Sequence, residues 1–308
     1  MLDVTKTVSS TDTDEIAEQF PWPIPSGAQH VPEWTGRGFR VDGRDVPVLV
    51  YSNADSGWSQ ELTEMHEAEL GSSHPIEVAS RQRALDAIGR YADALHVVLE
   101  VGCASGYFLG ELAQALPSSL VMGADNVPAL LQRLAQRHPE IPLLQFDIVR
   151  VPLPDASVDA VVALNVLEHI QDDAGAITQI RRILRPGGVF YLEVPAGPLL
   201  YGVHDRVLMH HRRYSLRGAV ALLKHAGFRI KRATHLGCFV YPAFALTKLA
   251  AKRYRHANSE QQEAIFRSSL RATRSSGGLD LTLRAERWLD RFVPLPFGIR
   301  CVVTAIAA

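Results

Sequence analysis

The amino-acid sequence predicts a doubly wound α/β fold, in which helices cover both faces of a mostly parallel sheet. From residue 96 onward, short runs of strand-forming residues alternate with helical stretches, which is typical of successive β-α-β units. One run, VDAVVAL at 158–164, is almost continuously apolar, as expected of a strand buried on both faces. A chain of 308 residues that is 47% hydrophobic also has enough apolar surface for one large core.

The predicted strands follow one another along most of the chain, and they make the sheet seven-stranded and Rossmann-like. They are expected at 96–101, 120–124, 143–146, 158–164, 189–194, 228–236 and 299–307. The stretch 238–297, between the last two strands, is too long for a turn. Its segments LTKLAAKRYR and LTLRAERWLDRF have the apolar spacing of amphipathic helices. We therefore predict a Rossmann-like domain over 76–308, with 238–297 inserted as a helical cap.

The first 75 residues are predicted to form an N-terminal arm and a small lid subdomain. Residues 1–30 are rich in Ser, Thr and Asp and run into PWPIPSG, where the prolines disfavour helix, so we expect a loose arm. The pattern of 39–52 predicts a small hairpin that turns at Asp42-Gly43. WSQELTEMHEAELG at 58–71 predicts a short helix, and a second helix is expected at 77–91.

Charge and cysteine content exclude several classes of function. The 32 Lys and Arg residues nearly balance the 33 Asp and Glu residues, so no global positive field is available to hold nucleic acid. Cys103, Cys238 and Cys301 are too scattered for a disulfide framework or a CxxC metal site, which favours a reducing cytoplasm. No apolar run reaches the ~20 residues that span a bilayer, and no secretory leader is recognisable. We expect a cytoplasmic protein.

The strongest chemical signal is VVLEVGCASGYFLGEL at 97–112. Here an apolar strand runs through Glu100, Gly102 and Gly106 into an apolar helix, and small residues let the backbone bring its N–H groups close to a ligand at the helix N-terminus. Flavin and nicotinamide proteins use the same kind of turn. The next strand ends at Asp125, where a carboxylate can accept both hydroxyls of a ribose. The third ends at Asp147, and the fourth opens into LNVLEHI.

These motifs, together with Asp147-Ile148, Asn165-Val-Leu-Glu-His169 and Leu184-Arg-Pro-Gly-Gly188 in that order, resemble class I S-adenosylmethionine methyltransferases. The resemblance covers 76–308 and lies in the branch that modifies small molecules, quinones and glycans. A nicotinamide-binding protein has no use for Leu-Glu-His followed by Arg-Pro-Gly-Gly. One departure is Ala104, which stands where the family often has a glycine.

The resemblance implies S-adenosyl-L-methionine as the cofactor. The backbone of 102–106 would face its methionine part, Asp125 its ribose, and Asp147 with Ile148 its adenine. Asn165 would lie beside the sulfonium. The implied cofactor-binding residues are Glu100, Gly102, Cys103, Ala104, Gly106, Asp125, Asn126, Asp147, Ile148 and Asn165.

A second motif, HDRVLMHHRRY at 204–214, is similar to a pattern of glycan-linked and natural-product members of the family. An oxygen acceptor must lose its proton as the methyl group is transferred, and a neutral imidazole suits that task. We favour His210 as the general base and Asp205 as its orienting partner. His211 and His204 are fallbacks, and His169 either lines the acceptor site or packs structurally.

Other interpretations of this motif remain open. One alternative is a hydrogen-bonded lid that only shapes the site. Arg212 and Arg213 can bind a phosphate or carboxylate of the acceptor, or the protein's own carboxylates. Tyr214 is a further candidate for binding the substrate. A metal held by His204, Asp205 and His210 lacks a compact ligand spacing, so we expect no metal site.

The predicted activity is methyl transfer to a hydroxyl group of a small metabolite, sugar or lipid-linked saccharide. In related enzymes the segment before the first strand folds over the cofactor, so Trp58, His66, His74 and Arg81 are candidates for closing the site, with Trp58 at the substrate. Carbon or nitrogen methylation, and a catalytically silent partner subunit, are the alternatives. The basic residues and apolar faces of 238–297 are compatible with peripheral membrane contact or a homodimer.

Overall fold

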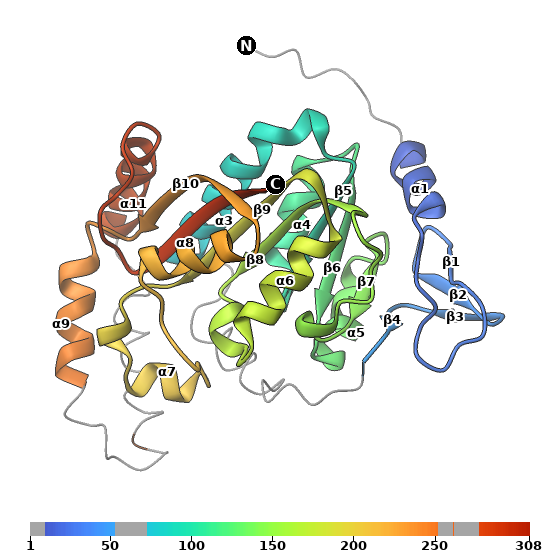
Figure 1. Cartoon of the computed structure of the whole chain (residues 1–308), viewed down its shortest axis with the longest axis horizontal. Helices are drawn as coiled ribbons and strands as arrows, with labels where there is room; N and C mark the ends of the chain where they lie inside the picture. Colours follow the sequence, from blue (N-terminus) through green and yellow to red (C-terminus); the bar gives the residue numbers. More distant parts are fainter. Residues whose placement is uncertain (1–9, 53–72, 252–260, 262–276) are drawn as a thin grey trace.

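The computed structural model of the protein describes residues 10–52, 73–251, 261 and 277–308, and it confirms the α/β fold (Figure 1). The main sheet has eight strands in the order β10-β11-β9-β8-β5-β6-β7-β4. Neighbours from β9 to β4 are parallel, whereas β11 is antiparallel to both β9 and β10. The strands are β4 (Leu49–Val50), β5 (Val97–Val101), β6 (Leu120–Asp125), β7 (Leu143–Gln145), β8 (Val158–Leu164), β9 (Leu184–Pro195), β10 (Phe228–Leu236) and β11 (Arg300–Ala307).

All seven predicted strands are present, and the eighth, β4, was not expected. Leu49 pairs with Leu144 and Val50 with Gln145, so β4 runs parallel to β7 at the edge of the sheet. Leu49 is buried. Two residues are too few to show a strand period in the sequence, because an alternating pattern needs at least four positions.

Helices cover both faces of the sheet in two buried layers. On one face, Ile177 and Ile180 of α6 and Leu223 of α8 belong to one apolar cluster with the strands. On the other face, α3, α4 and α5 contribute to a second cluster, which includes Leu109 and Leu131. The helices of these layers are α3 (Pro75–Ile88), α4 (Tyr107–Ala115), α5 (Pro128–Arg137), α6 (Asp173–Ile183) and α8 (Leu216–His225).

Part of the predicted loose arm is ordered, so that prediction was wrong for residues 10–30. α1 (Ser10–Gln19) precedes a small antiparallel sheet of β1 (Glu33–Trp34), β2 (Phe39–Val41) and β3 (Arg44–Val46), in which the predicted turn at Asp42-Gly43 is confirmed. Trp22 packs edge-on against Phe39, with ring centroids 4.9 Å apart, and donates a hydrogen bond to the Ala17 carbonyl. The buried aromatic rings supply the apolar contacts that a loose arm would lack. The predicted helix at 58–71 lies outside the described residues.

The second predicted helix is α3, which begins at Pro75 and is followed by the 3-10 helix η1 (Gly89–Ala94). His74 caps its N-terminus by accepting a hydrogen bond from the backbone N–H of Ile76. Pro at the first turn is favourable because its missing N–H would have no helical partner there.

Asp159 is a charged residue buried in β8. Its carboxylate accepts hydrogen bonds from the backbone N–H groups of His96 and Val97 and forms an ion pair with Arg185 at 2.7 Å. It thereby joins the start of β5 to the start of β9.

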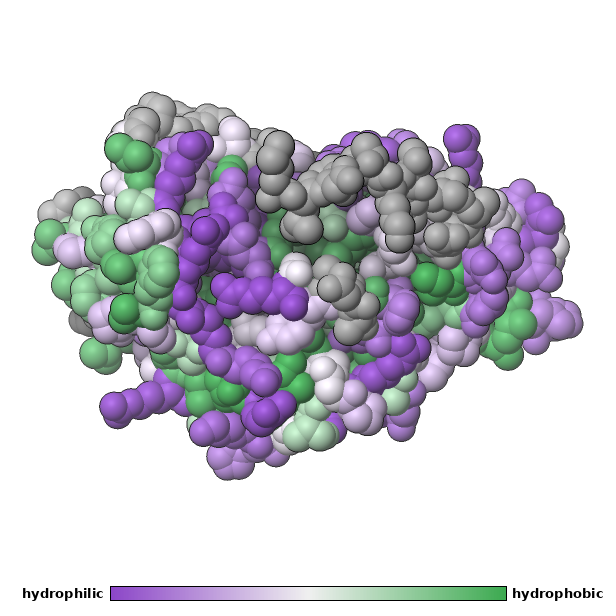
Figure 2. All heavy atoms as spheres, turned by 90° about the horizontal axis from the view of Figure 1, so that it is seen from above, coloured by the Kyte–Doolittle hydropathy of each residue, from purple (hydrophilic) through white to green (hydrophobic). Residues whose placement is uncertain are grey.

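Within the predicted cap, the structure describes α9 (Tyr241–Ala251) and α11 (Gly277–Asp290). Arg83 of α3 anchors α11 through ion pairs with Glu286 at 2.8 Å and Asp290 at 3.1 Å, in a buried setting. Apolar side chains gather at the end of the molecule that α9 and α11 form (Figure 2). The exposed ones include Leu246, Leu249, Leu281, Trp288 and Phe292. None of the described helices has the length and apolar character needed to cross a membrane.

Candidate active site

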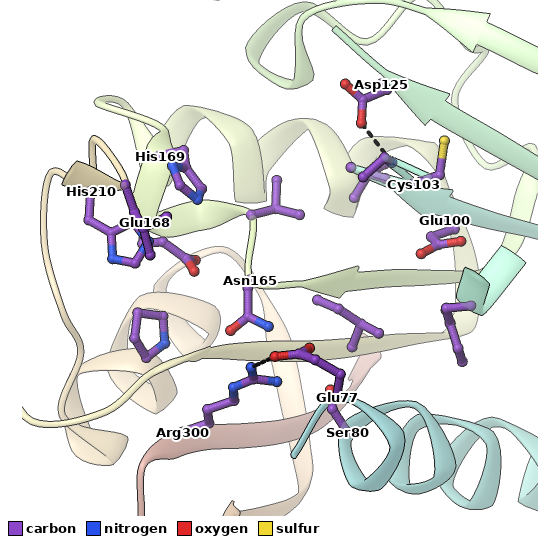
Figure 3. A pocket seen from close by; sticks show the side chains of 18 of the residues that line it. Glu77, Ser80, Glu100, Cys103, Asp125, Asn165, Glu168, His169, His210 and Arg300 are labelled. Carbon is purple, nitrogen blue, oxygen red and sulfur yellow. Dashed lines mark hydrogen bonds and ion pairs between the residues drawn. The ribbon is translucent and has the colours of Figure 1, made fainter. Parts of the chain in front are cut away.

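A cavity of about 550 Å³ opens at the edge of the sheet where the parallel strands end. Figure 3 shows Glu100, Cys103 and Asp125 at one end of it, Glu168, His169 and His210 at the other, and Asn165 between them. Ligands bind at this edge in doubly wound folds, because the strand ends and the following turns leave backbone groups free there. The predicted residues that line the cavity are Glu100, Gly102, Cys103, Ala104, Gly106, Asp125, Asn126, Asp147, Ile148, Asn165, His169, His204, His210 and Arg213, with His74 and Arg81.

The turn after β5 has the backbone conformation that its small residues allow. Gly102 and Gly106 have φ of +71° and +74°, and Ala104 has φ of +43°. A Cβ at Gly102 would lie 2.4 Å from Val166 Cγ2, so only glycine fits there. Ala104 adopts a left-handed conformation that glycine takes more easily, which explains why a glycine is common at this place. The departure from the family pattern is compatible with the turn.

Asp125 holds this turn in place. One carboxylate oxygen accepts a hydrogen bond from the Ala104 N–H at 2.9 Å, and the other accepts one from Val127 at 2.9 Å. A carboxylate has about four acceptor positions, so these two bonds leave Asp125 able to accept ribose hydroxyls as well.

Glu100 lies deeper, with 4% of its surface exposed, and its Oε2 has no hydrogen-bond partner among the described residues. Burial, with the nearby charge of Asp125, raises the pKa of Glu100 well above its ordinary value. A cationic group beside Glu100 would satisfy the oxygen and favour the carboxylate. The α-amino group of a methionine moiety is such a cation, so this end of the cavity fits the implied cofactor.

The opposite side of this end is apolar. Phe146 and Ile148 are buried and line the cavity, next to Asp147. Asp147 accepts a hydrogen bond from the backbone N–H of Val149 at 3.1 Å and so caps η2 (Ile148–Arg150). The apolar surface suits a flat heterocycle such as adenine. Asp147 and Ile148 were predicted from the sequence to bind the adenine, whereas Phe146 was not.

Asn165 lies in the middle of the cavity with φ of +54°. Its amide donates to Glu193 Oε1 at 3.4 Å, and the same oxygen accepts from Ser80 at 2.6 Å and from Arg300 at 2.6 Å. Arg300 also pairs with Glu77 (Figure 3). This network was not predicted from the sequence. The one available signal was Glu193, a charged residue in the otherwise apolar strand segment VFYLEVP, which a buried strand tolerates only when the charge is paired.

The second motif places His210 and Asp205 together as predicted. His210 Nδ1 lies 3.1 Å from Asp205 Oδ1, and Asp205, in the middle of α7 (Val203–Val207), is fully buried. A carboxylate only accepts hydrogen bonds, so Nδ1 carries the proton and Nε2 is left as the acceptor. Burial lowers the pKa of His210 below its ordinary value. Asp205 also pairs with Arg213 at 2.6 Å and with Lys248 at 3.4 Å.

Three residues of this motif do not reach the cavity, which corrects the predictions made for them. The His211 side chain is exposed. Arg212 pairs with Asp173 at 2.8 Å and donates to the Gln171 carbonyl. The Tyr214 hydroxyl donates to Asp173 at 2.7 Å within the core. These contacts fasten the segment to the start of α6, and the motif is therefore structural in part.

Glu168 and His169, on η3 (Leu167–His169), meet His210 at the end of the cavity away from Glu100, and one possible ligand atom from each lies within 4.8 Å of the others. The His169 and His210 rings are edge to face at 4.6 Å. Burial raises the pKa of Glu168 to about 8, so this carboxyl group is mostly protonated at neutral pH. His204, whose pKa burial and Lys248 lower to about 3, also lines this end and stays neutral. Trp58 and His66 lie outside the described residues.

The strand order, the glycine turn with its acidic strand ends, and the cavity define a class I methyltransferase. Residues 99–192 match a family model described as a methyltransferase domain. A protein of Mycolicibacterium smegmatis, described as a probable S-adenosylmethionine-dependent methyltransferase, is 32% identical over 207 residues, or 63% of this chain and 77% of that protein. The chain therefore belongs to the S-adenosylmethionine-dependent methyltransferases, and S-adenosyl-L-methionine is its cofactor.

Two further comparisons are informative, one at lower coverage and one at lower sequence identity. A trans-aconitate 2-methyltransferase of Azoarcus is 31% identical over 103 residues, which is 33% of this chain and 40% of that enzyme. A solved structure from Galdieria sulphuraria, provisionally described as a sarcosine dimethylglycine methyltransferase, aligns with a TM-score of 0.57 at 15% identity. That alignment covers 81% of this chain and 99% of the other, and it shows the shared fold.

Proposed function

We propose that the protein transfers the methyl group to a hydroxyl oxygen of a small metabolite, sugar or lipid-linked saccharide, with His210 as the general base. The observation that carries this proposal is the buried Asp205–His210 pair, 3.1 Å apart, at the end of the cavity opposite Glu100. Bound S-adenosyl-L-methionine supplies a methyl group on a sulfonium that is open to in-line attack.

His210 would act through its Nε2 atom, which accepts the hydroxyl proton as the acceptor oxygen attacks. Because its lowered pKa keeps the ring neutral near pH 7, the base is ready without a prior proton loss. Asp205 fixes the tautomer and stabilises the imidazolium that forms. Asp205 remains ionised, because the hydrogen bond from His210 and the charges of Lys248 and Arg213 lower its pKa in spite of burial.

The cofactor would be bound as the motif order implies. In this arrangement Glu100 and the backbone of 102–106 hold the methionine part, Asp125 and Asn126 the ribose, and Asp147 with Ile148 the adenine. Asn165 lies beside the sulfonium. The support is their common lining of one end of the cavity and the unsatisfied Glu100 oxygen.

The test compares His210→Ala with His211→Ala, since both histidines lie in the same motif but only the first lines the cavity. Extracted metabolites and labelled cofactor identify an acceptor, and kcat and the cofactor dissociation constant are then measured for each variant. His210→Ala should lower kcat by ~10²–10⁴-fold, the usual effect of losing a general base, with cofactor binding unchanged. His211→Ala should behave as the wild type. A parallel loss of cofactor binding in His210→Ala would make the segment a structural lid.

A carboxylate oxygen is a second candidate acceptor, favoured by the similarity to a trans-aconitate 2-methyltransferase over a third of the chain. A carboxylate is already deprotonated at neutral pH, so it needs no base. In that case His210→Ala would leave kcat close to the wild-type value, and the product would be a methyl ester.

The cap offers a surface for the predicted membrane contact or homodimer. Leu246 and Leu249 of α9 and Trp288 of α11 are exposed, at 69%, 51% and 61% of their surface. Apolar clusters of this kind on a protein surface often mark interfaces. Light scattering of the protein with and without anionic vesicles separates the two possibilities, and a monomer that ignores vesicles would exclude both.

A further inference from the structure

Lys248 is an unusual residue in the cavity wall. It belongs to α9 in the cap, lines the cavity beside Phe244 and Thr247, and has only 6% of its surface exposed. Its ammonium group can donate three hydrogen bonds. With described residues it makes one, to Asp205 at 3.4 Å. A lysine is almost never buried without full pairing, so a further partner is expected at this position.

The charges around Lys248 do not balance. Arg213, also in the cavity wall, pairs with Asp205 at 2.6 Å, and both cations lie against the Phe244 ring at 5.5–5.6 Å. Two cations therefore share one carboxylate. Glu168 does not restore neutrality, because a carboxyl group that is 1% exposed, with one oxygen lacking a partner among the described residues, is favoured in its protonated form. Burial and Arg213 lower the pKa of Lys248 to about 7, in line with a surplus of positive charge.

The two ends of the cavity thus carry different ionisable groups. The cofactor end carries the carboxyl groups of Glu100 and Asp125, and the other end has Arg213 and Lys248. We propose that the acceptor carries an oxyanion, a carboxylate or a phosphate, that binds to Lys248 and Arg213. This assignment rests on the proposed function, since it gives the acceptor its place in the same cavity. In this assignment Lys248 takes the place of Arg212 as the second cation at the acceptor, because Arg212 pairs with Asp173.

The same charges disfavour a cation at Glu168, His169 and His210, although these three groups converge. A divalent ion there would lie near Arg213 and Lys248, which contact the carboxylate that orients His210. Like charges in a buried site repel strongly. An anion relieves the repulsion that a metal would increase.

Titration of small anions into the full chain saturated with S-adenosylhomocysteine tests this proposal. The probes are malonate, inorganic phosphate and, as an uncharged match of malonate, malonamide, with the protein first treated with EDTA. Malonate or phosphate should bind and malonamide should not, and the stronger of the two anions identifies the preferred group. Lys248→Met should weaken anion binding at least tenfold, whereas Lys248→Arg should retain it. Lys224→Met, which removes an exposed lysine from the end of α8, should have no effect.

The outcomes separate this proposal from the methyltransferase proposal. Equal anion binding by Lys248→Met and the wild type, with S-adenosylhomocysteine affinity and melting temperature intact, would overturn the oxyanion site alone. Equal binding of malonamide and malonate would do the same. Binding of Mn²⁺ that Glu168→Gln removes would overturn it in favour of a metal site. If S-adenosylhomocysteine itself does not bind, the proposed function fails first.

Discussion

His210 gives the pH dependence of the reaction a definite sign. Burial lowers its pKa below the ordinary value of 6.5, and only the neutral ring can accept a proton. We therefore expect the decline of kcat that His210 protonation causes to have its midpoint below about pH 6.5. Measurement of kcat at saturating acceptor, across about pH 5 to 8, checks this. A decline of kcat centred above pH 6.5 would mean that a group other than His210 titrates.

Gly102 permits a separation of steric and conformational effects. The Gly102→Ala change would add a Cβ 2.4 Å from Val166 Cγ2 at a φ of +71°, and overpacking of this kind costs ~1–3 kcal/mol. Gly187→Ala is the matched control, because its φ is +84° but nothing lies within 4 Å of the added carbon. In urea unfolding, Gly102→Ala should lose more stability than Gly187→Ala. Adding Val166→Ala to Gly102→Ala should restore the stability lost relative to Gly187→Ala. If it does not, the loss comes from the backbone conformation at residue 102.

At the scale of single elements, the buried carboxylate of Glu286 contributes to the attachment of α11. Glu286 is fully buried, pairs with Arg83, and accepts hydrogen bonds from the backbone N–H groups of Gly237 and Phe239. Replacement by leucine would leave the Arg83 charge short of a partner, and breaking a buried pair in this way costs ~3–5 kcal/mol.

Asp280→Ala serves as the control, since it removes an exposed ion pair with Arg284 on the same helix. Such pairs contribute ~0.3–0.5 kcal/mol. The free energy of unfolding from urea titration should therefore fall by several kcal/mol for Glu286→Leu and hardly at all for Asp280→Ala. Similar losses for the two would mean that α11 is not held by the buried pair.

The elements themselves were largely predictable, and their side-chain directions were not. Continuous apolar runs such as 158–164 and the small residues after β5 are local signals, because burial on both faces and a sharp turn each demand particular residue types. Arg212 and Arg213 are neighbours in an irregular segment that includes Met209 at φ of +53°. No period applies there, so the sequence could not indicate that only Arg213 faces the cavity.

Contacts between distant parts of the chain were equally hidden. Ser80, Glu193 and Arg300 come from α3, β9 and β11 and meet only because the sheet places β11 next to β9, with Arg300 opposite Pro195. Lys248 reaches the cavity because α9 lies near η4 (Pro198–Leu200). Pattern and propensity describe neighbours along the chain, whereas these contacts depend on tertiary packing.

For the whole molecule, the different ionisable groups at the two ends of the cavity suggest how two ligands are directed to separate places. The cationic groups of the cofactor favour the carboxylate forms of Glu100 and Asp125 at one end, and an oxyanion is attracted to Arg213 and Lys248 at the other. Each ligand is disfavoured at the other's place. Orientation by charge of this kind contributes to specificity more than to affinity.

The position of β11 has a consequence for how the protein is made. Although 300–307 follow all the other described strands in the chain, β11 lies inside the sheet between β9 and β10. A ribosome-bound chain that stops short of residue 300 therefore leaves β9 and β10 with unpaired edges, and it lacks the guanidinium that joins Glu193 to Glu77. Cofactor affinity should thus arise only once residues 300–307 have been made, and chains that lack them would expose strand edges that invite aggregation.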